Sequence, residues 1–251
     1  MSRPFDLEGE VAIVTGASRP LGRHVSAVLA LAGAKVGVTD PSMAAIDALA
    51  AEIERDGARA LPVELDASST ESIARAVEVT ETELGPVTIL VNAAEAGDGK
   101  RLLDTTESDW DNVLAASLRG SFLVAREVAR HMIKLGHPGR IVNVASVLGQ
   151  TAAGRGHAHA AAHAGLLHLT RTLALELARD GIRVNAIAAG LIETETPRVV
   201  ADEQLLARIP LGRFGTVEDL DGALLLLAGP ASRYMTGAII TVDGGLSISA
   251  L

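Results

Sequence analysis

The sequence of 251 residues contains no cysteine, one tryptophan, three phenylalanines and one tyrosine. Without cysteine, the chain can form no disulfide and can use no thiolate as a nucleophile. Its single tyrosine, Tyr234, lies near the end, and its only lysines are Lys35, Lys100 and Lys134. No tyrosine therefore stands one helical turn from a lysine, and proton transfer by a tyrosine–lysine pair is not expected.

The chain also lacks an excess of positive charge and lacks long apolar runs. Its formal net charge of -9 argues against a nucleic-acid or anionic-membrane partner, because both need a basic surface. No uncharged apolar stretch approaches the length of a membrane span. No apolar run follows Arg3, so no signal peptide is expected. A cytoplasmic protein is the default expectation.

Hydrophobic residues make up 48% of the chain, which suits one globular domain over residues 1–251. Short β-branched runs alternate with stretches rich in alanine and leucine. The expected strands are Val11–Thr15, Lys35–Asp40, Arg59–Leu65, Val87–Asn92, Arg140–Ala145, Arg183–Ala188 and Ile239–Val242. The expected helices are Leu21–Gly33, Ser42–Asp56, Thr70–Leu84, Asp109–Leu135, His157–Asp180 and Thr216–Ala228.

Most of the expected strands lack polar alternation, which predicts burial on both faces. Strands of this kind alternating with helices indicate parallel βαβ units, and so an α/β protein with helices on both faces of a doubly wound sheet. Two helix starts resemble capping boxes, Ser68 with Glu71 and Thr216 with Asp219.

The first strand runs into a glycine-rich turn, TGASRPLG at Thr15–Gly22. Glycines there let the backbone approach a pyrophosphate, and the following helix presents its N–H groups. The second strand ends at Asp40, where a carboxylate can accept hydrogen bonds from an adenosine ribose and repel a 2′-phosphate. Arg19 has the opposite preference, because a guanidinium suits a phosphate. The turn predicts a dinucleotide, with NAD favoured over NADP.

Further motifs follow this turn along the chain. They are LVNAAE at Leu90–Glu95, GRIVNVAS at Gly139–Ser146, AGLLHLTRTLALEL at Ala164–Leu177, RVNAIAAG at Arg183–Gly190 and the tail Pro210–Gly245. Over essentially its full length the chain resembles the short-chain dehydrogenase/reductases, and it is similar to the branch that includes 3-oxoacyl-carrier-protein reductases. The resemblance implies a Rossmann-type, seven-stranded, doubly wound sheet. It also implies an NAD(P)-dependent oxidoreductase of small carbonyl or alcohol substrates, assembled as a homodimer, a homotetramer or a mixed oligomer with an active family member.

The resemblance also implies which positions contact the cofactor. They are Gly16, Ser18, Arg19, Leu21, Gly22, Asp40, Asp66, Ala67, Asn92, Gly190 and Thr194. Two residues depart from the family pattern, Pro20 and Glu95, which both stand where the family has glycine. Proline lacks an N–H and cannot adopt positive φ, whereas Glu95 brings bulk and negative charge toward an anionic dinucleotide. Both departures predict weak or lost cofactor binding.

The catalytic positions differ most from the family. The family's tyrosine, lysine, serine and asparagine map to His159, His163, Ser146 and Ser117 in this chain. Two imidazoles one helical turn apart are close enough for their titrations to couple, so at least one should be neutral at neutral pH. A neutral imidazole accepts a proton well but donates poorly to a carbonyl. Ordinary carbonyl reduction is therefore expected to be slow.

Several interpretations stay open at this point. The chain is an oxidoreductase with an atypical site, or a non-redox lyase, hydratase or isomerase that uses Ser146 and His159. Alternatively it is an inactive partner subunit or binding protein whose histidines have drifted. Chelation of a metal by His159 and His163 is the least favoured, because no further ligand lies beside them in sequence, and no metal site is predicted. The segment Leu191–Ile209 is expected to form a lid.

Overall fold

The computed structural model describes residues 4–97, 99–193 and 203–249, so the predicted cofactor contact Thr194 lies outside the described residues. Seven parallel strands form one sheet in the order β3-β2-β1-β4-β5-β6-β7. The strands are β1 Val11–Thr15, β2 Lys35–Asp40, β3 Arg59–Glu64, β4 Ile89–Asn92, β5 Gly139–Ser146, β6 Ile182–Ala189 and β7 Ile239–Val242. This is the doubly wound α/β sheet that the sequence predicts, with strand ends displaced by two residues at most.

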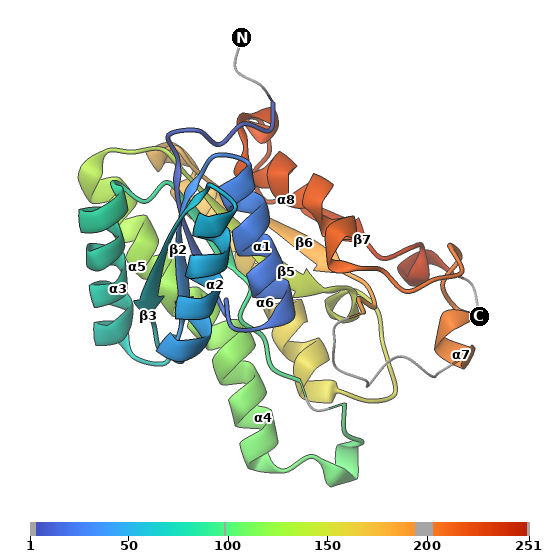
Figure 1. Cartoon of the computed structure of the whole chain (residues 1–251). Helices are drawn as coiled ribbons and strands as arrows, with labels where there is room; N and C mark the ends of the chain where they lie inside the picture. Colours follow the sequence, from blue (N-terminus) through green and yellow to red (C-terminus); the bar gives the residue numbers. More distant parts are fainter. Residues whose placement is uncertain (1–3, 98, 194–202, 250–251) are drawn as a thin grey trace.

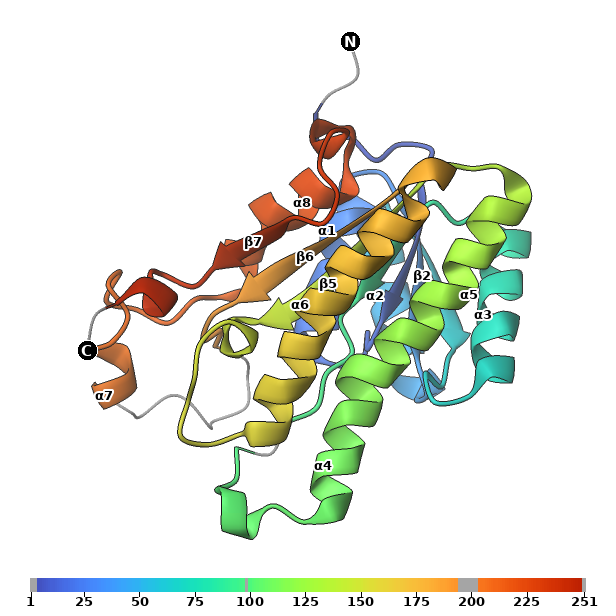
Figure 2. The same cartoon turned by 180° about the vertical axis from the view of Figure 1, so that it is seen from behind.

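Helices cover both faces of the sheet, as Figures 1 and 2 show from opposite sides. The α-helices are α1 Pro20–Leu31, α2 Met43–Arg55, α3 Thr70–Leu84, α4 Glu107–Leu114, α5 Gly120–Leu135, α6 His157–Leu177, α7 Glu203–Leu206 and α8 Asp221–Ala228. Helices α1, α2 and α8 share one apolar cluster with the sheet, and α3, α5 and α6 share another on the opposite face. No described helix is long and apolar enough to cross a membrane.

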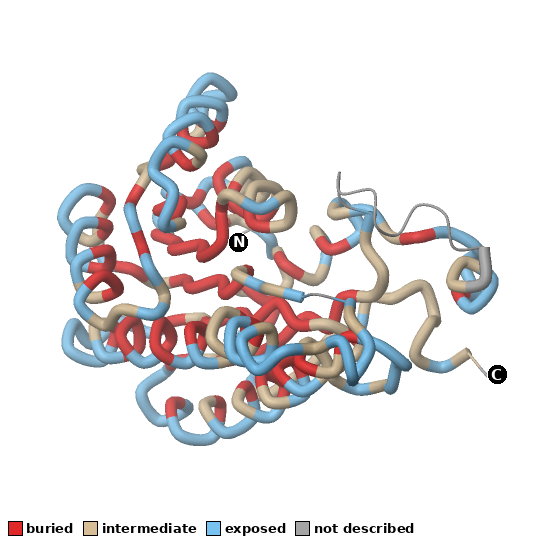
Figure 3. The backbone as a smooth tube through the Cα atoms, turned by 90° about the horizontal axis from the view of Figure 1, so that it is seen from below, coloured by how far each residue is buried: buried red, intermediate tan, exposed pale blue. Residues whose placement is uncertain are grey.

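The core lies between the sheet and these two helical layers. Buried residues follow the strands and the inward faces of the helices, while outward faces are exposed (Figure 3). Strand β1 is buried along its whole length, which agrees with its lack of polar alternation. Burial of this core leaves the edge where the parallel strands end as the place where polar side chains can gather.

The stretch Asp109–Leu135, predicted as one helix, is interrupted. Helix α4 is followed by a π-helical segment, Ala115–Arg119, before α5 begins. A π-helical bulge inserts an extra residue into the helical ladder and often marks a functional site. Here it carries Ser117, one of the predicted site residues. Periodicity did not show this bulge, because the apolar pattern continues through it.

Two helix starts can be checked against the capping predictions. Thr216 and Asp219 form the predicted capping box, in which the Thr216 N–H donates to Asp219 Oδ2 at 2.8 Å. The prediction at Ser68 is wrong by one residue, because Ser69 caps α3 and accepts from the Ser72 N–H. Ser68 instead donates to the Asp66 carboxylate. A run of two serines left that start ambiguous.

The strand order places the site. Because the chain winds outward in both directions from β1 and β4, the crossovers on either side of this pair lie on opposite faces of the sheet. In open α/β sheets, ligands bind at such a reversal, outside the carboxyl ends of the strands. The expected lid segment contains the short helix α7 and, in its described part, an isolated bridge between Ile192 and Gly215.

Candidate active site

The turn between β1 and α1 is built on close backbone contacts that only glycine permits. A Cβ at Gly22 would stand 2.2 Å from the Gly16 carbonyl oxygen. A Cβ at Gly16 would stand 2.7 Å from the Ala94 Cα, and the φ of Gly16 is +70°. Thr15 Oγ1 joins the same two strand ends by accepting from the Ala93 and Ala94 N–H groups at 3.2 and 3.3 Å. The sequence therefore holds β1, α1 and the residues after β4 tightly together.

The start of α1 is suited to an anionic group. Arg19 is the N-cap residue and makes no side-chain capping hydrogen bond, Pro20 occupies the first turn, and that turn carries no acidic residue. Backbone N–H groups of the first turn have no partner within a helix, and the dipole there favours negative charge. Proline at this position removes one such N–H without distorting the helix. The turn therefore fits a pyrophosphate despite Pro20.

Asp40 lies beside this turn at the end of β2. Its carboxylate accepts from Ser18 Oγ at 2.6 Å and from the Ser42 N–H at 3.1 Å, and it is half-buried. These hydrogen bonds hold a negative charge where an adenosine ribose would be bound in such a sheet. Arg19 is exposed to solvent at the same turn.

The remaining positions predicted to contact the cofactor differ in their exposure and in their hydrogen bonds. Asp66 is exposed, and hydrogen bonds from Ser68 lower the pKa of its carboxyl. The Asn92 side chain is buried and donates to Asn143 Oδ1 at 2.9 Å, and the residue as a whole presents almost no surface to a ligand. Gly190 lies so close to Asp243 that a Cβ would stand 2.6 Å from the Asp243 Cα. The two other positions, Leu21 and Ala67, are half-buried.

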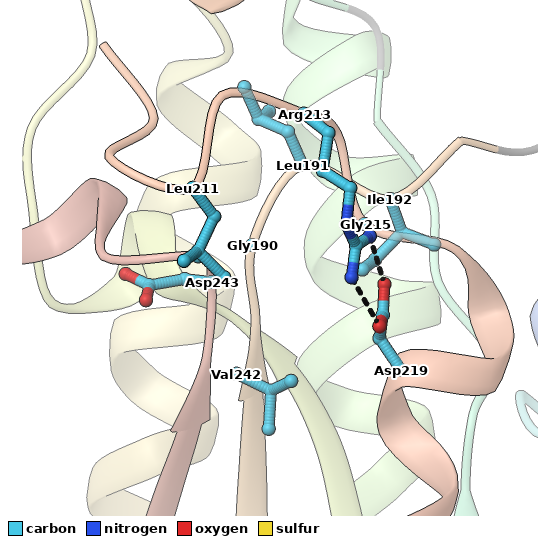
Figure 4. Close-up of a pocket in the computed structure, with 10 residues that line it drawn as sticks. Gly190, Leu191, Ile192, Leu211, Arg213, Gly215, Asp219, Val242 and Asp243 are labelled. Carbon is cyan, nitrogen blue, oxygen red and sulfur yellow. Dashed lines mark hydrogen bonds and ion pairs between the residues drawn. The ribbon is translucent and has the colours of Figure 1, made fainter.

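Figure 4 shows a small pocket at the ends of β6 and β7. Leu191, Ile192 and Leu211 give it apolar walls, and Arg213 lies beside them. The Arg213 guanidinium binds both Asp219 carboxylate oxygens, at 2.6 and 2.8 Å, and this contact lowers the pKa of Asp219 to about 2. The arginine is therefore paired within the wall. The pocket adjoins the site because β5 ends beside β6.

His163 lies beneath the end of β5. The Ser146 backbone N–H donates to His163 Nδ1 at 3.1 Å. Because an N–H can only donate, Nδ1 must hold a lone pair, and in the neutral ring Nε2 carries the hydrogen. The side chain is 1% exposed, and Nε2 has no hydrogen-bond partner among the residues that the structure describes. Burial, together with the neighbouring His159, lowers the pKa of His163 to about 3. The ring is neutral at neutral pH.

The burial of His163 has a local cause. The turn Val147–Gly149, directly after β5, packs on α6. A Cβ at Gly149 would stand 2.7 Å from the His163 carbonyl carbon. The absence of that Cβ lets the turn cover the histidine and exclude water from most of the ring.

His159 lies one helical turn before His163 and has the opposite tautomer. Its Nδ1 is 3.3 Å from the Ala96 carbonyl oxygen, which can only accept a hydrogen bond. Nδ1 must therefore donate, and in the neutral ring Nε2 keeps its lone pair. The two ring centroids are 4.1 Å apart with an interplanar angle of 54°.

Ser117 joins this group through the same backbone segment. It is fully buried, and its Oγ accepts from the Ala96 N–H at 3.1 Å. The π-helical bulge places the hydroxyl at that point. Ser146 Oγ accepts from the Leu148 N–H at 3.2 Å, which leaves its own hydrogen for another acceptor. The structure thus gathers the four predicted catalytic positions around the ends of β4 and β5.

Glu95 also belongs to this group, and its position beside the two histidines was not predicted from the sequence. Its Oε2 lies 3.9 Å from His163 Nε2. One carboxylate oxygen and one ring nitrogen from each histidine all lie within 4.8 Å of one another. The sequence marked Glu95 only as a neighbour of the dinucleotide. A usable signal was present, because Glu95 follows β4 and β4 pairs with β5, whose last residue is Ser146.

Comparisons with known proteins identify the family of this chain. A family model described as enoyl-(acyl carrier protein) reductase matches residues 16–247. The 3-oxoacyl-[acyl-carrier-protein] reductase of Aquifex aeolicus is 39% identical over 96% of this chain and 98% of its own length. Gluconate 5-dehydrogenase of Gluconobacter oxydans is 35% identical over 99% of this chain and its own full length. The chain belongs to the short-chain dehydrogenase/reductase family.

A solved structure shows the same fold with a ligand. The gluconate 5-dehydrogenase of Burkholderia cenocepacia, in complex with NADP and tartrate, superposes with a TM-score of 0.94 at 33% identity, covering 98% of each chain. As a short-chain dehydrogenase/reductase, the present protein is by family an NAD(P)-dependent oxidoreductase. The glycine turn, the uncapped start of α1 and Asp40 fit such a dinucleotide.

Proposed function

We propose that this protein oxidises an alcohol to a carbonyl compound with NAD or NADP, and that His159 is the base. One observation carries the proposal: His159 Nδ1 lies 3.3 Å from the Ala96 carbonyl, which leaves the Nε2 lone pair as a proton acceptor. A neutral imidazole accepts a proton readily, but its one N–H is a very weak acid and here faces the Ala96 carbonyl, so oxidation suits this ring better than carbonyl reduction. Residues 1–251 would act as one dinucleotide-binding domain.

Each side chain at the site has its own role in the proposed oxidation. His159 Nε2 takes the hydroxyl proton of the substrate, and the Ala96 carbonyl keeps the ring oriented while it does so. The Ser146 hydroxyl donates to the substrate oxygen. His163 Nε2–H is buried and has no hydrogen-bond partner among the described residues, so in this conformation it is not open to the dinucleotide; Glu95 Oε2 lies 3.9 Å from it. When bound, the oxidised nicotinamide supplies the acceptor for the hydrogen and electron pair that leave the carbinol carbon.

The comparisons and Asp40 bear on the choice of substrate and cofactor. One relative is named for oxidation of gluconate, and the solved gluconate dehydrogenase holds tartrate, so small hydroxy acids are the first substrates to test. That structure holds NADP. Asp40 nevertheless places a carboxylate where a 2′-phosphate would be repelled, which supports NAD as the preferred cofactor.

The test is the initial rate of NAD and NADP reduction with gluconate, tartrate, simple secondary alcohols and 3-hydroxyacyl thioesters. Replacing His159 by Gln should lower kcat by about 10²–10⁴-fold, the usual contribution of a general base. His157→Gln is the matched control, because His157 begins the same helix outside this cluster. Oxidation that survives His159→Gln would show that another group is the base.

Two other outcomes would favour the competing interpretations. Conversion of a substrate without any dinucleotide, but dependent on His159 and Ser146, would indicate a lyase, hydratase or isomerase. If calorimetry shows that none of NAD, NADH, NADP and NADPH binds, the protein is better explained as a non-catalytic partner subunit or binding protein.

A dimer or tetramer through α5 and α6 is part of the same proposal. Exposed apolar side chains on the two helices support it, notably Phe122, Ile133, Leu135 and Leu175, the last of which is 82% exposed. Light scattering at micromolar concentration is the measurement, and a strictly monomeric protein would contradict the assembly.

A further inference from the structure

The cluster of Glu95, His159 and His163 contains a charge that the proposed reaction has not used. Glu95 comes from the segment after β4, whereas both histidines come from the first turns of α6. The Glu95 side chain is 47% exposed, yet its Oε2 lies 3.9 Å from His163 Nε2, which is buried and has no hydrogen-bond partner in the described part of the chain. A carboxylate placed at this distance alters the energy of any positive charge that forms on the rings.

Two histidines and a carboxylate have the composition of a metal site, but the hydrogen bonding opposes one. A histidine that binds a metal through Nε2 normally donates its other N–H to an acceptor. His163 Nδ1 instead accepts from the Ser146 N–H. Its Nε2 therefore carries the hydrogen in the neutral ring, and a metal would have to displace that hydrogen and leave an imidazolate. The geometry favours a proton-handling group over a metal centre.

His163 also limits which residue can balance a charge on His159. When His159 accepts the substrate proton it becomes a cation, and the two ring centroids are only 4.1 Å apart. Because His163 is buried and neutral, it adds no second positive charge but supplies no negative charge either. On the segments packed against the start of α6, Lys100 and Asp109 lie 2.6 Å apart and pair with each other. Glu95 is the carboxylate of the cluster itself.

We propose that Glu95 is a positioning residue that stabilises the imidazolium formed on His159 during alcohol oxidation. This inference rests on the proposed function. It gives a physical reason for finding Glu95 together with the two histidines. A phenol base works better beside a cation, because the cation favours the phenolate, and the family pattern implies a lysine at position 163. An imidazole base works better beside an anion, because the anion favours the imidazolium. The sign of the required charge is reversed, and Glu95 supplies it.

The first experiment compares Glu95→Gln with Glu95→Asp at pH 7, using whichever alcohol of the panel the parent protein oxidises. We expect Glu95→Gln to lower kcat about tenfold with little change in KM, and Glu95→Asp to recover most of the loss. Dinucleotide affinity, measured separately by calorimetry, should be unchanged or higher in Glu95→Gln, since a negative charge has been removed. Equal kcat in the parent protein and Glu95→Gln overturns the inference while leaving the proposed function in place.

The second experiment asks whether the sign of the effect depends on the residues at 159 and 163. In the parent protein, Glu95→Gly should lower kcat. In the double variant His159→Tyr, His163→Lys, the same Glu95→Gly change should raise carbonyl reduction, because a carboxylate opposes ionisation of the phenol and pairs with the lysine. A merely structural role for Glu95 would give the same sign in both proteins, and that result overturns the inference.

The third experiment measures whether the protein binds zinc. Calorimetric titration of the parent protein with zinc chloride should show no micromolar binding. Tight binding that Glu95→Gln removes would make the cluster a metal site and overturn the inference. A parent protein that oxidises no member of the panel overturns the proposed function, and the role of Glu95 falls with it.

Discussion

The two halves of the candidate site are built on different principles. At the ends of β1 and β2, the site consists mainly of backbone: a glycine turn, the start of α1 and one carboxylate held by Ser18 and Ser42. At the ends of β4 and β5, it consists of side chains whose ring nitrogens and hydroxyls are individually placed. A backbone site depends on conformation and accepts many sequences. A side-chain site depends on the identity of each residue, which is why the proposed chemistry depends on His159 and His163.

The largest effect of a substitution is expected at the glycine turn between β1 and α1. Gly22→Ala should abolish measurable dinucleotide binding and lower the free energy of unfolding by about 1–3 kcal/mol, because the new Cβ would stand 2.2 Å from the Gly16 carbonyl oxygen. Urea unfolding and calorimetric titration measure the two effects. Gly222→Ala is the matched control: no atom lies within 4 Å of its added Cβ, and alanine should stabilise α8 by about 0.5–1 kcal/mol. Unchanged binding in Gly22→Ala would show that the turn does not hold the cofactor.

In the half of the site at the ends of β4 and β5, the burial of His163 should make the stability of the protein depend on pH. Burial lowers the pKa of His163 to about 3 in the folded protein, whereas in the unfolded chain it lies near its ordinary value of 6.5. Between these values the unfolded chain binds a proton that the folded protein does not, so stability is full above pH 6.5 and falls as the pH drops toward 3. At pH 5 the loss from this group should be about 2 kcal/mol.

His163→Gln removes this titration and keeps an oxygen that can accept from the Ser146 N–H. Urea unfolding at pH 7.5 and 5.0 should therefore show a smaller decrease in stability for His163→Gln than for the parent protein, while His157→Gln should behave like the parent protein. An identical decrease in all three proteins would mean that His163 is protonated in the fold.

A smaller effect concerns the choice of dinucleotide. Asp40→Asn should shift the ratio of NAD to NADP affinity toward NADP by about tenfold, because a negative charge beside the 2′-position is removed. Arg19→Gln is the opposing control and should shift the ratio toward NAD. Calorimetric dissociation constants for NAD and NADP give this ratio for the parent protein and for each variant. A ratio that responds to neither change would show that neither Asp40 nor Arg19 lies beside the 2′-position of the bound cofactor.

The smallest effect is expected at Pro20. Replacing it by Gly restores one backbone N–H at the start of α1 and should tighten dinucleotide binding a few-fold, on the order of 1 kcal/mol or less. The turn already fits a pyrophosphate by its geometry, so the gain should be modest. Weaker binding after Pro20→Gly would show that the proline preorganises the turn and that its missing N–H costs nothing.

The parts of the structure that followed from sequence are those set by local pattern. Buried strands without polar alternation, glycine at the β1–α1 turn and the Thr216 capping box were all readable from neighbouring residues. The bulge at Ser117 and the shifted cap at Ser69 were not, because the apolar period runs through the former and two adjacent serines compete for the latter. The family was likewise readable from its motifs. That its tyrosine and lysine correspond to His159 and His163 stays a prediction.

The sequence by itself determined the fold, the nucleotide turn and the four residues predicted at the catalytic positions, because each depends on short-range pattern and motif. Only the tertiary structure decided their state. It made His163 neutral by covering it with the turn after β5, and it set opposite tautomers on the two rings through Ser146 and Ala96. It also brought Glu95 to within 4.8 Å of both histidines. Burial, tautomer and charge proximity depend on what packs against a group in space, and 63 residues separate Ala96 from His159 along the chain.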